Sequence, residues 1–344
     1  MLNKIPKISC SLLAAVDGAV ALPDVLKKLD IVGVDIIHYD VSDNAKTLHL
    51  KDIEQLRRNT CLPFDVHLSV EDPLPHLQDV KLQPEDYFCI HVENNLSWSQ
   101  LEEVRHKVGC NFGLAINTET PVSELFDKAQ ILDYALFMSA TPGVSGGQFN
   151  DQVVNKIKAF RRAFPKVKVH VDGGVNHLSA ALLRELEVDV LISGSYILKN
   201  EDYLVQLVKL FGKNLYLRVS DIMRVRDQVP RVTPDTDICQ TVLEMNTKQV
   251  GCTCVVDHEN HLLGLVTDGD VRRRLIVQPD LSDLKAKDLM ASRPFVATPE
   301  TRLLHLLREL DKRHAGFDVI PVVDVSEQCV GLVWLRDIIS SHAL

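Results

Sequence analysis

The sequence contains no long hydrophobic run and no excess of basic residues. Of its 344 residues, 46% are hydrophobic and 25% are charged, yet no apolar stretch reaches the roughly 18–20 residues that span a bilayer. The formal net charge of −9 disfavours nucleic acids and anionic membranes as partners, because both attract basic surfaces. Asp17 interrupts the apolar N-terminal stretch, which therefore predicts a strand rather than a signal peptide. We expect a cytoplasmic protein with no membrane or nucleic-acid partner.

Paired cysteines are missing as well. None of the eight cysteines has the C-x-x-C spacing of a metal or disulfide framework, and most lie within apolar runs. Cys252 and Cys254 alternate in a strand-like segment, so one buried face accounts for both. We predict reduced, buried thiols for the whole set, which is Cys10, Cys61, Cys89, Cys110, Cys239, Cys252, Cys254 and Cys329.

Short β-branched segments alternate with helical patterns from residue 7 to residue 212. The strand-like segments are KISCSLLA, VDIIHYDV, PFDVHLSV, YFCIHVE, NFGLAIN, YALFMSA, VKVHVDGG and DVLISGS. Between them, stretches such as LKDIEQLRRN and NDQVVNKIKAFRRAF have apolar residues at helical spacing. Eight such units in about 210 residues favour an α/β fold of the closed (β/α)8 TIM-barrel type, whose active sites lie where strands end. We predict this barrel over residues 1–214.

The character of the sequence changes after Leu215. Two segments each contain D-[IL]-M, a V-x-P strand end, a helix, a V-V-D strand and a G-L-V-x-x-x-D turn. An internal repeat of about 65 residues implies two copies that pack on each other. We place this second, α+β domain at residues 215–344, with the repeats at about 218–277 and 284–344.

Four polar residues stand near the ends of predicted barrel strands. His38 and Asp40 are two apart, so both side chains point to the same face, which in a small barrel is the interior. His67 and Asp172 stand near the ends of two further strands. Buried histidine and aspartate are costly unless they are paired or bind a metal. Together the four suit one divalent cation with mixed N and O ligands, such as Zn²⁺, Fe²⁺, Mn²⁺ or Co²⁺.

Glycine-rich segments follow the last three predicted strands. They are PGVSGGQ, DGGV and SGS, and each offers clustered backbone N–H groups. The loops after strands seven and eight are where barrels commonly hold a phosphate group. A single glycine pair usually marks only a turn, but three such segments beside a metal site indicate a phosphate-binding pocket.

These motifs, in this order, resemble the ribulose-phosphate 3-epimerase family across the whole barrel. The resemblance rests on ISCSLLAA, VDIIHYDVSDN, FDVHLSV, HVE, GLAIN, PGVSGGQF, VDGGV and ISGS. It implies that the metal ligands are His38, Asp40, His67 and Asp172. It further implies that Asp40 and Asp172 are the catalytic acid/base pair, acting from opposite faces of the substrate. The implied substrate contacts are Ser11, His67, Met138, Gly146, Gly147, Gly173, Gly174, Gly194 and Ser195.

Some positions depart from the family's pattern. Ser42 and Ser69 replace two of the methionines that usually surround the reacting carbons, the loop after the second strand is the short NAKTLHL, and Ser145 is an extra residue in the glycine loop. The two hydroxyls predict a roomier and more polar pocket. We expect conversion of ribulose 5-phosphate to xylulose 5-phosphate by default. The alternatives are a longer phosphorylated ketose, or a non-catalytic regulator that binds a sugar phosphate or a nucleotide.

The C-terminal repeats resemble a CBS pair, most closely the pair attached to arabinose-5-phosphate isomerases, through strings such as LRVSDIM and TDGDVRR. In CBS modules a G-x-x-[ST]-x-x-D turn presents its Thr and Asp to a nucleotide ribose. Gly264, Thr267 and Asp270 match this pattern, whereas the second repeat keeps Asp337 but has Trp334 in place of Thr. We therefore predict one competent nucleotide or nucleotide-sugar site, with Thr267 and Asp270 lining one cleft and Trp334 narrowing another.

Two further features of this region leave alternatives open. The run Arg272–Arg274 after the first turn would either meet phosphate groups or form a solvated helix face. The pair itself would either bind a regulatory ligand or serve only to dimerise the protein. In both cases we expect a homo-oligomer.

Overall fold

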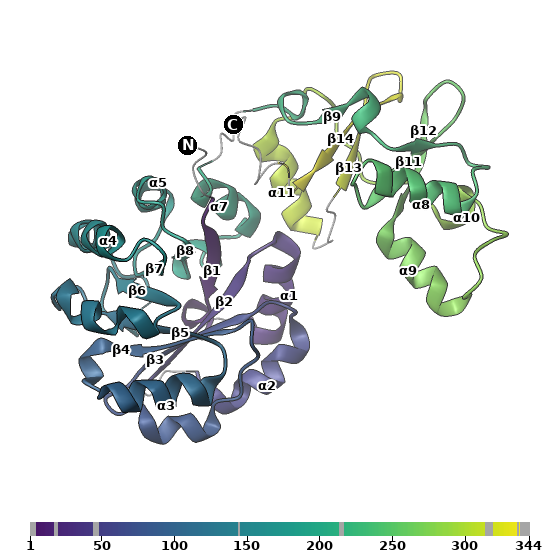
Figure 1. Ribbon diagram of the computed structural model, residues 1–344. Helices are drawn as coiled ribbons and strands as arrows, with labels where there is room; N and C mark the ends of the chain where they lie inside the picture. The colour runs from purple at the N-terminus through teal and green to yellow at the C-terminus, as the bar shows by residue number, and fades with distance from the viewer. Residues whose placement is uncertain are drawn as a thin grey trace. The chain divides into compact units, whose positions relative to one another are not determined.

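The computed structural model describes residues 5–16, 20–43, 48–143, 145–212, 217–313, 319–335 and 337. The chain divides after Gly212 into two compact units, a barrel and a smaller unit of two sheets (Figure 1). Within the described residues, no helix combines the length and the apolar character needed to cross a bilayer.

Eight parallel strands close into a barrel in chain order, which confirms the predicted (β/α)8 architecture. Most of their residues are buried on both faces, as expected when helices cover the outside of a parallel sheet. The strands are β1 (Lys7–Ser11), β2 (Ile36–Ser42), β3 (Phe64–Ser69), β4 (Tyr87–His91), β5 (Asn111–Ile116), β6 (Tyr134–Met138), β7 (Lys168–Asp172) and β8 (Val190–Ile192).

The connections between strands are less regular than the sequence pattern predicts. The expected helix over 50–59 is a short α2 (Ile53–Leu56) between two 3-10 turns, because Asn59 caps the carbonyls of Gln55 and Leu56 and ends the helix early. Longer 3-10 segments, Leu74–Asp79 and Val122–Ile131, follow β3 and β5. The remaining helices are α1 (Leu22–Val32), α3 (Trp98–Val108), α4 (Gln152–Ala163), α5 (His177–Glu185), α6 (Ser195–Leu198) and α7 (Tyr203–Leu210).

Local capping fixes the chain where it leaves β7. The Asn176 side chain accepts hydrogen bonds from the backbone N–H groups of Leu178 and Ser179, while the Ser179 hydroxyl accepts from the Asn176 N–H. Asn176 also donates to the carbonyl of Gly174. The start of α5 therefore holds the glycine turn that follows β7 in one conformation.

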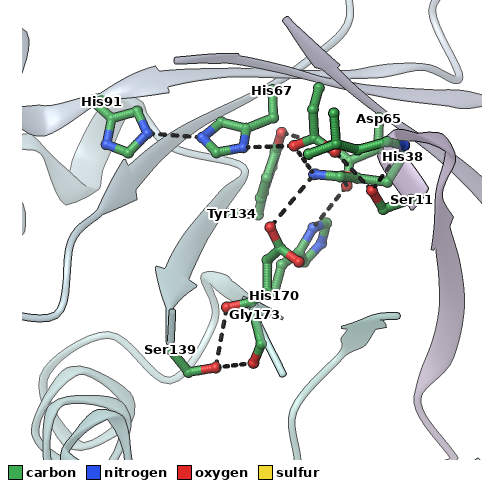
Figure 2. A network of polar contacts seen from close by, with 12 residues as sticks. Ser11, His38, Asp65, His67, His91, Tyr134, Ser139, His170 and Gly173 are labelled. Carbon is green, nitrogen blue, oxygen red and sulfur yellow. Dashed lines mark hydrogen bonds and ion pairs between the residues drawn. The ribbon is translucent and has the colours of Figure 1, made fainter. Parts of the chain in front are cut away.

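An aromatic layer lies inside the barrel beneath the carboxyl ends of the strands. A Cβ added at Gly113 would lie 2.6–2.8 Å from ring atoms of Tyr134, so β5 leaves the space that this ring fills. The Tyr134 ring stacks on His170 with centroids 4.1 Å apart, and its hydroxyl donates to Asp65 at 3.2 Å. This layer supports the polar cluster above it (Figure 2).

The second unit contains two three-stranded sheets. One has the order β10 (Arg231–Val232), β11 (Cys252–Val256) and β12 (Leu262–Thr267), and the other has the order β13 (Val319–Val323), β14 (Cys329–Trp334) and β9 (Arg224–Val225). One apolar cluster takes buried residues from both sheets, among them Cys254, Leu265, Val319 and Leu332. The helices are α8 (Ile238–Thr247), α9 (Asp268–Val277), α10 (Ala286–Leu289) and α11 (Leu303–Arg313).

The two repeats exchange their opening segments. Strand β9, from the first repeat, pairs with β14 of the second, and a Cβ at Gly331 would lie 2.7 Å from the sulfur of Met223. In the same way the sulfur of Met290 lies 2.7 Å from where a Cβ at Gly264 would stand. Each D-[IL]-M motif thus packs on the glycine of the other repeat. Each packed sheet region therefore contains residues from both sequence repeats.

The cysteines are all free thiols, but not all are buried. Cys61 and Cys239 are exposed and Cys110 is half-buried, so the prediction of buried thiols is wrong for these three. Cys61 lies in the loop before β3, and Cys239 lies in the first turn of α8.

Candidate active site and metal centre

Four side chains meet at the carboxyl-terminal mouth of the barrel. Strand β2 supplies His38 and Asp40, β3 supplies His67, and Asp172 is the last residue of β7. One ligand atom from each residue lies within 4.8 Å of those of the other three. Asp40 stands opposite His67 in the register of β2 and β3, and strand alternation turns His38 to the same interior face.

The contacts within this cluster are short and centre on Asp40. Its Oδ1 lies 3.1 Å from His38 Nε2 and 3.2 Å from His67 Nδ1, and its Oδ2 accepts from the Ser11 hydroxyl at 2.7 Å. His38 Nε2 also lies 3.8 Å from Asp172 Oδ2. Both imidazole side chains are fully buried, and the Asp172 side chain is 18% exposed.

Burial and neighbouring charges move the pKa values of the cluster in different directions. Burial disfavours charge on His38, but Asp40 and Asp65 outweigh it and raise the pKa of His38 well above its usual range. For Asp40, burial is likewise outweighed by His38 and His67, which hold its pKa far below the ordinary value. Burial raises the pKa of Asp172 to about 7, despite the opposing charge of His38. Positive charge among these four side chains would stabilise the ionised forms of Asp40 and Asp172.

Carboxylates also lie behind both histidines. His38 Nδ1 lies 3.1 Å from Asp65 Oδ2, and His67 Nε2 lies 2.8 Å from His91 Nε2, whose Nδ1 is 3.2 Å from Glu93 Oε2 (Figure 2). The sequence analysis did not assign these three supporting residues. Asp65 is two residues before His67, so strand alternation alone would have placed it inside the barrel.

One cleft at this mouth brings together most of the predicted substrate contacts. Asp40 and Asp172 line it, and Thr141, Ser145 and Ser193 also face it. The predicted contacts that line it are Ser11, Met138, Gly146, Gly147, Gly173, Gly174, Gly194 and Ser195. His67 is not among the described residues that line the cleft, and its side chain is fully buried.

Two glycines of this cleft are required by close packing between loops. Gly173 has φ +105°, and a Cβ there would lie 2.5 Å from the backbone nitrogen of Ala140. Gly174 has φ +62° and stands directly against the backbone of Gln148 and Phe149. The loops after β6 and β7 therefore touch backbone to backbone, and the carbonyls of Asp172 and Gly173 accept from the Ser139 hydroxyl.

The second unit has a cleft at the first predicted turn. Thr267 and Asp270 line it and form a capping box at the start of α9. Trp334 lines the same cleft, so the prediction that it narrows a different one is wrong; the interleaved repeats bring the ends of β12 and β14 together. Asp337 is not among the described residues that line it, and its carboxylate accepts two hydrogen bonds from Arg224.

Comparison with known families assigns both units. Residues 7–198, more than half of the chain, match the ribulose-phosphate 3-epimerase family, and residues 219–277 and 286–343 match the CBS domain. The chain belongs to the ribulose-phosphate 3-epimerase family. A CBS pair follows its epimerase-family barrel.

Two ribulose-phosphate 3-epimerases and one solved CBS-pair structure are similar to parts of the chain. The chain is 32% identical to ribulose-phosphate 3-epimerase of Bacillus subtilis over 205 residues, which are 57% of this chain and 94% of that protein. It is 27% identical to the Aquifex aeolicus enzyme over 186 residues, 52% of this chain and 84% of that protein. The CBS-pair protein CBSX2 from Arabidopsis thaliana covers 36% of this chain and 91% of its own at 25% identity, with a TM-score of 0.32.

The epimerase-family barrel carries its two serine replacements side by side. Ser42 ends β2 and Ser69 ends β3, the two are register partners, and both are half-buried. They stand two residues beyond Asp40 and His67 along the same strands. Of the short loop NAKTLHL, residues 44–47 lie outside the described residues, as does Val144 in the glycine loop.

The donor set fits a divalent cation. Two imidazole nitrogens and two carboxylates are the mixed ligands that Zn²⁺, Fe²⁺, Mn²⁺ and Co²⁺ accept, and they converge in a largely buried position. Without a cation, His38 and His67 compensate the charge of Asp40, whereas burial raises the pKa of Asp172 to about 7. A metal site of this kind is consistent with the family.

We expect one divalent ion per chain at this cluster. Replacing Asp40 with Asn should lower the affinity for Mn²⁺ or Co²⁺ by at least about tenfold, because a charged ligand is lost. Titration calorimetry of ion-free protein measures this, with Asp43→Asn as the control because Asp43 is an exposed carboxylate at the same mouth. Equal affinities for the Asp40→Asn variant and the wild type would contradict the assignment.

Proposed function

We propose that the barrel is a metal-dependent 3-epimerase of a phosphorylated ketose, with ribulose 5-phosphate and xylulose 5-phosphate as the default pair. The observation that carries the proposal is the meeting of two carboxylates, the buried Asp40 and the 18% exposed Asp172, in a cleft that the glycine loops also line. They come from β2 and β7, which are separated by two strands in the closed barrel. Carboxylates that reach one point from different strands suit proton transfer on two faces of a substrate.

The reaction needs a proton removed from C3 and another delivered to its opposite face. In the proposed mechanism one of Asp40 and Asp172 accepts the C3 proton while the other donates to the far face, and the roles reverse for the opposite epimer. A cation held by His38, Asp40, His67 and Asp172 would supply positive charge for the substrate oxygens that become negative. Ser11, which donates to Asp40 Oδ2, holds that carboxylate in place.

The phosphate group would lie against the glycine loops. Gly146, Gly173 and Gly194 bring three loops to the cleft that Asp40 and Asp172 also line. Backbone N–H groups bind phosphate without demanding a charged side chain. Phosphate binding at this wall would set the distance between the carboxylates and C3, which explains why a fixed loop geometry matters for catalysis.

The role of Asp172 is tested by Asp172→Asn. The amide cannot shuttle a proton, so epimerisation at saturating metal should fall by about 10²–10⁴-fold while the fold persists. Exchange of the C3 proton of ribulose 5-phosphate in D₂O, followed by NMR, measures the step directly. Asp151→Asn makes the same change at an exposed site on the barrel and should keep wild-type rates. Wild-type turnover by Asp172→Asn refutes the role.

A second candidate substrate follows from Ser42 and Ser69. Two small hydroxyl side chains side by side leave room and polarity for a ketose of six carbons or more. The double variant Ser42→Met/Ser69→Met should shift the ratio of kcat/KM values toward ribulose 5-phosphate by about tenfold or more. The double alanine variant separates loss of hydroxyls from loss of space. If the wild type already prefers ribulose 5-phosphate and the methionines change nothing, the serines do not select the substrate.

A third candidate function, a barrel that binds a sugar phosphate without turning it over, is less well supported. Such a barrel has no need of His38, Asp40 and His67 buried beside Asp172, because buried histidine and aspartate are costly. Proton exchange at C3 distinguishes this binding protein from the epimerase.

For the CBS pair we propose a regulatory nucleotide or nucleotide-sugar site in the cleft at Thr267. Four arginines line this cleft, Arg272, Arg273, Arg293 and Arg313, against two aspartates. Only Arg273 has a carboxylate partner among the described residues, Asp270 at 2.5 Å, while Arg313 lies over the Phe295 ring. The surplus of guanidinium groups favours a ligand with more than one phosphate.

A thermal-shift screen of nucleoside di- and triphosphates and nucleotide sugars tests this site. Binding to the folded state alone stabilises it by about 2.7 kcal/mol at a hundredfold excess over Kd. Arg293→Ala should reduce the shift, whereas Arg162→Ala on the barrel should not. We avoid Asp270→Ala because Asp270 caps α9. If no ligand stabilises the protein and truncation after Gly212 abolishes oligomers, the CBS pair serves only in assembly.

A further inference from the structure

The CBS pair contains two turns of equivalent sequence, which we call the first turn (residues 264–270) and the second turn (residues 331–337). Each lies beside a segment from the other repeat, directly after a D-[IL]-M motif. In that segment Ala291 pairs with Leu265 of the first turn, and Arg224 takes the corresponding place beside the second. The two turns therefore differ by one large side chain at a position that the repeat makes equivalent.

The second turn holds the Arg224 side chain through Asp337 and Trp334. Arg224 Nε donates to Asp337 Oδ2 at 2.6 Å and Nη2 donates to Oδ1 at 3.0 Å, so both carboxylate oxygens are engaged. The guanidinium carbon of Arg224 lies 4.9 Å from the centroid of the Trp334 ring. Forked hydrogen bonds to a carboxylate and stacking on an aromatic face are the two contacts that suit a planar guanidinium best.

At the first turn the corresponding place is open. Ala291 offers only a methyl group, and it lines the same cleft as Thr267 and Asp270. The Asp270 carboxylate pairs with Arg273, whose side chain is 72% exposed and can turn away when a ligand arrives. A ligand can therefore reach the first turn, whereas at the second a guanidinium of the protein itself already takes the carboxylate.

Trp334 connects the two turns. It belongs to the second turn, where Arg224 lies over its ring, and it also lines the cleft of the first turn. Leu265, Phe295 and Val319 line this cleft as well, so its lining includes apolar and aromatic surface beside the arginines. An aromatic ring in such a wall suits stacking on a nucleotide base. The position of the Trp334 ring therefore affects the shape of the ligand site.

We propose that Arg224 occupies the second turn in place of a ligand and thereby fixes Trp334 as part of the wall of the first cleft. The CBS pair then has one open ligand site per chain, and Arg224 is a positioning residue for that site. The inference rests on the proposed nucleotide site for its function, whereas the contact between Arg224 and Trp334 is a property of the ligand-free protein.

Fluorescence of Trp334 tests this contact without any ligand. The sequence has two tryptophans, and the other, Trp98, is 44% exposed on the barrel, so Trp98→Phe leaves Trp334 alone. In this background Arg224→Ala should raise the acrylamide quenching constant by about twofold, because the ring loses a stacked group and gains rotamer freedom. Arg302→Ala removes an exposed guanidinium from the same unit and should change nothing. Equal quenching in the Arg224→Ala protein and its background overturns the proposal.

Titration calorimetry with ATP tests the number of sites. The wild type should bind one ATP per chain, and Arg224→Ala should weaken this binding by about 2–10-fold, because the Trp334 ring must then be ordered by the ligand. Arg224→Ala/Trp334→Thr gives the second turn the residues of the first and should bind a second ATP, which Asp337→Ala removes again. Two ATP per wild-type chain, or one per chain in a folded double variant, contradicts the proposal.

Failure of the proposed nucleotide site gives a different result. A wild type that binds neither ATP nor any other ligand of the screen refutes that function. If quenching of Trp334 still rises in Arg224→Ala, Arg224 remains the group that holds the ring, and the CBS pair serves another purpose.

Discussion

Asp40 sits in a buried position where Ser11, His38 and His67 each approach within 3.2 Å. A carboxylate in such a place is stable only if its charge is compensated, because burial removes it from water. This requirement determines which residues can occupy the mouth of the barrel. It explains the two imidazoles beside Asp40, whereas the second acid, Asp172, has its pKa raised to about 7 by burial. The same demand for compensating charge is what a divalent cation would meet.

The register of the barrel strands, rather than the loops, places the compensating side chains around Asp40. Adjacent strands β2 and β3 bring Asp40 opposite His67, and alternation turns His38 and Asp65 to the same interior. Beneath them Gly113 admits the Tyr134 ring, whose hydroxyl holds Asp65. Ligand positions built on strands are held more rigidly than positions on loops. The loops carry the predicted substrate contacts, and the glycine turn after β7 packs closely against the loop after β6.

Much of this arrangement could be predicted from sequence because side chains alternate between the two faces of a strand with a period of two residues. Strand alternation and strand ends were enough to find the four members of the cluster, and glycine clustering found the cleft wall. The repeat in the second unit was visible too, but two copies of one motif cannot reveal whether Met223 packs on its own repeat or on the other. The structure shows the exchange, and with it the position of Trp334 beside Thr267. Because the two repeats have the same motif, the local sequence does not show whether a motif packs on its own repeat or on the other.

Glu93 illustrates the other limit of sequence analysis. Its hydrogen-bond partners, Asn117 and Thr120, lie in the turn after β5. Lys156 of α4 donates hydrogen bonds to the backbone carbonyls of the same turn. Burial lowers the pKa of Lys156, yet its ammonium group satisfies backbone oxygens at Asn117, Thr118 and Thr120. The turn is thus fixed from both sides, by a carboxylate on its N–H side and by an ammonium on its carbonyls. Because the turn cannot rotate, the donors that hold Glu93 keep their direction. A helix far along the chain thereby supports the orientation of an imidazole at the centre of the barrel.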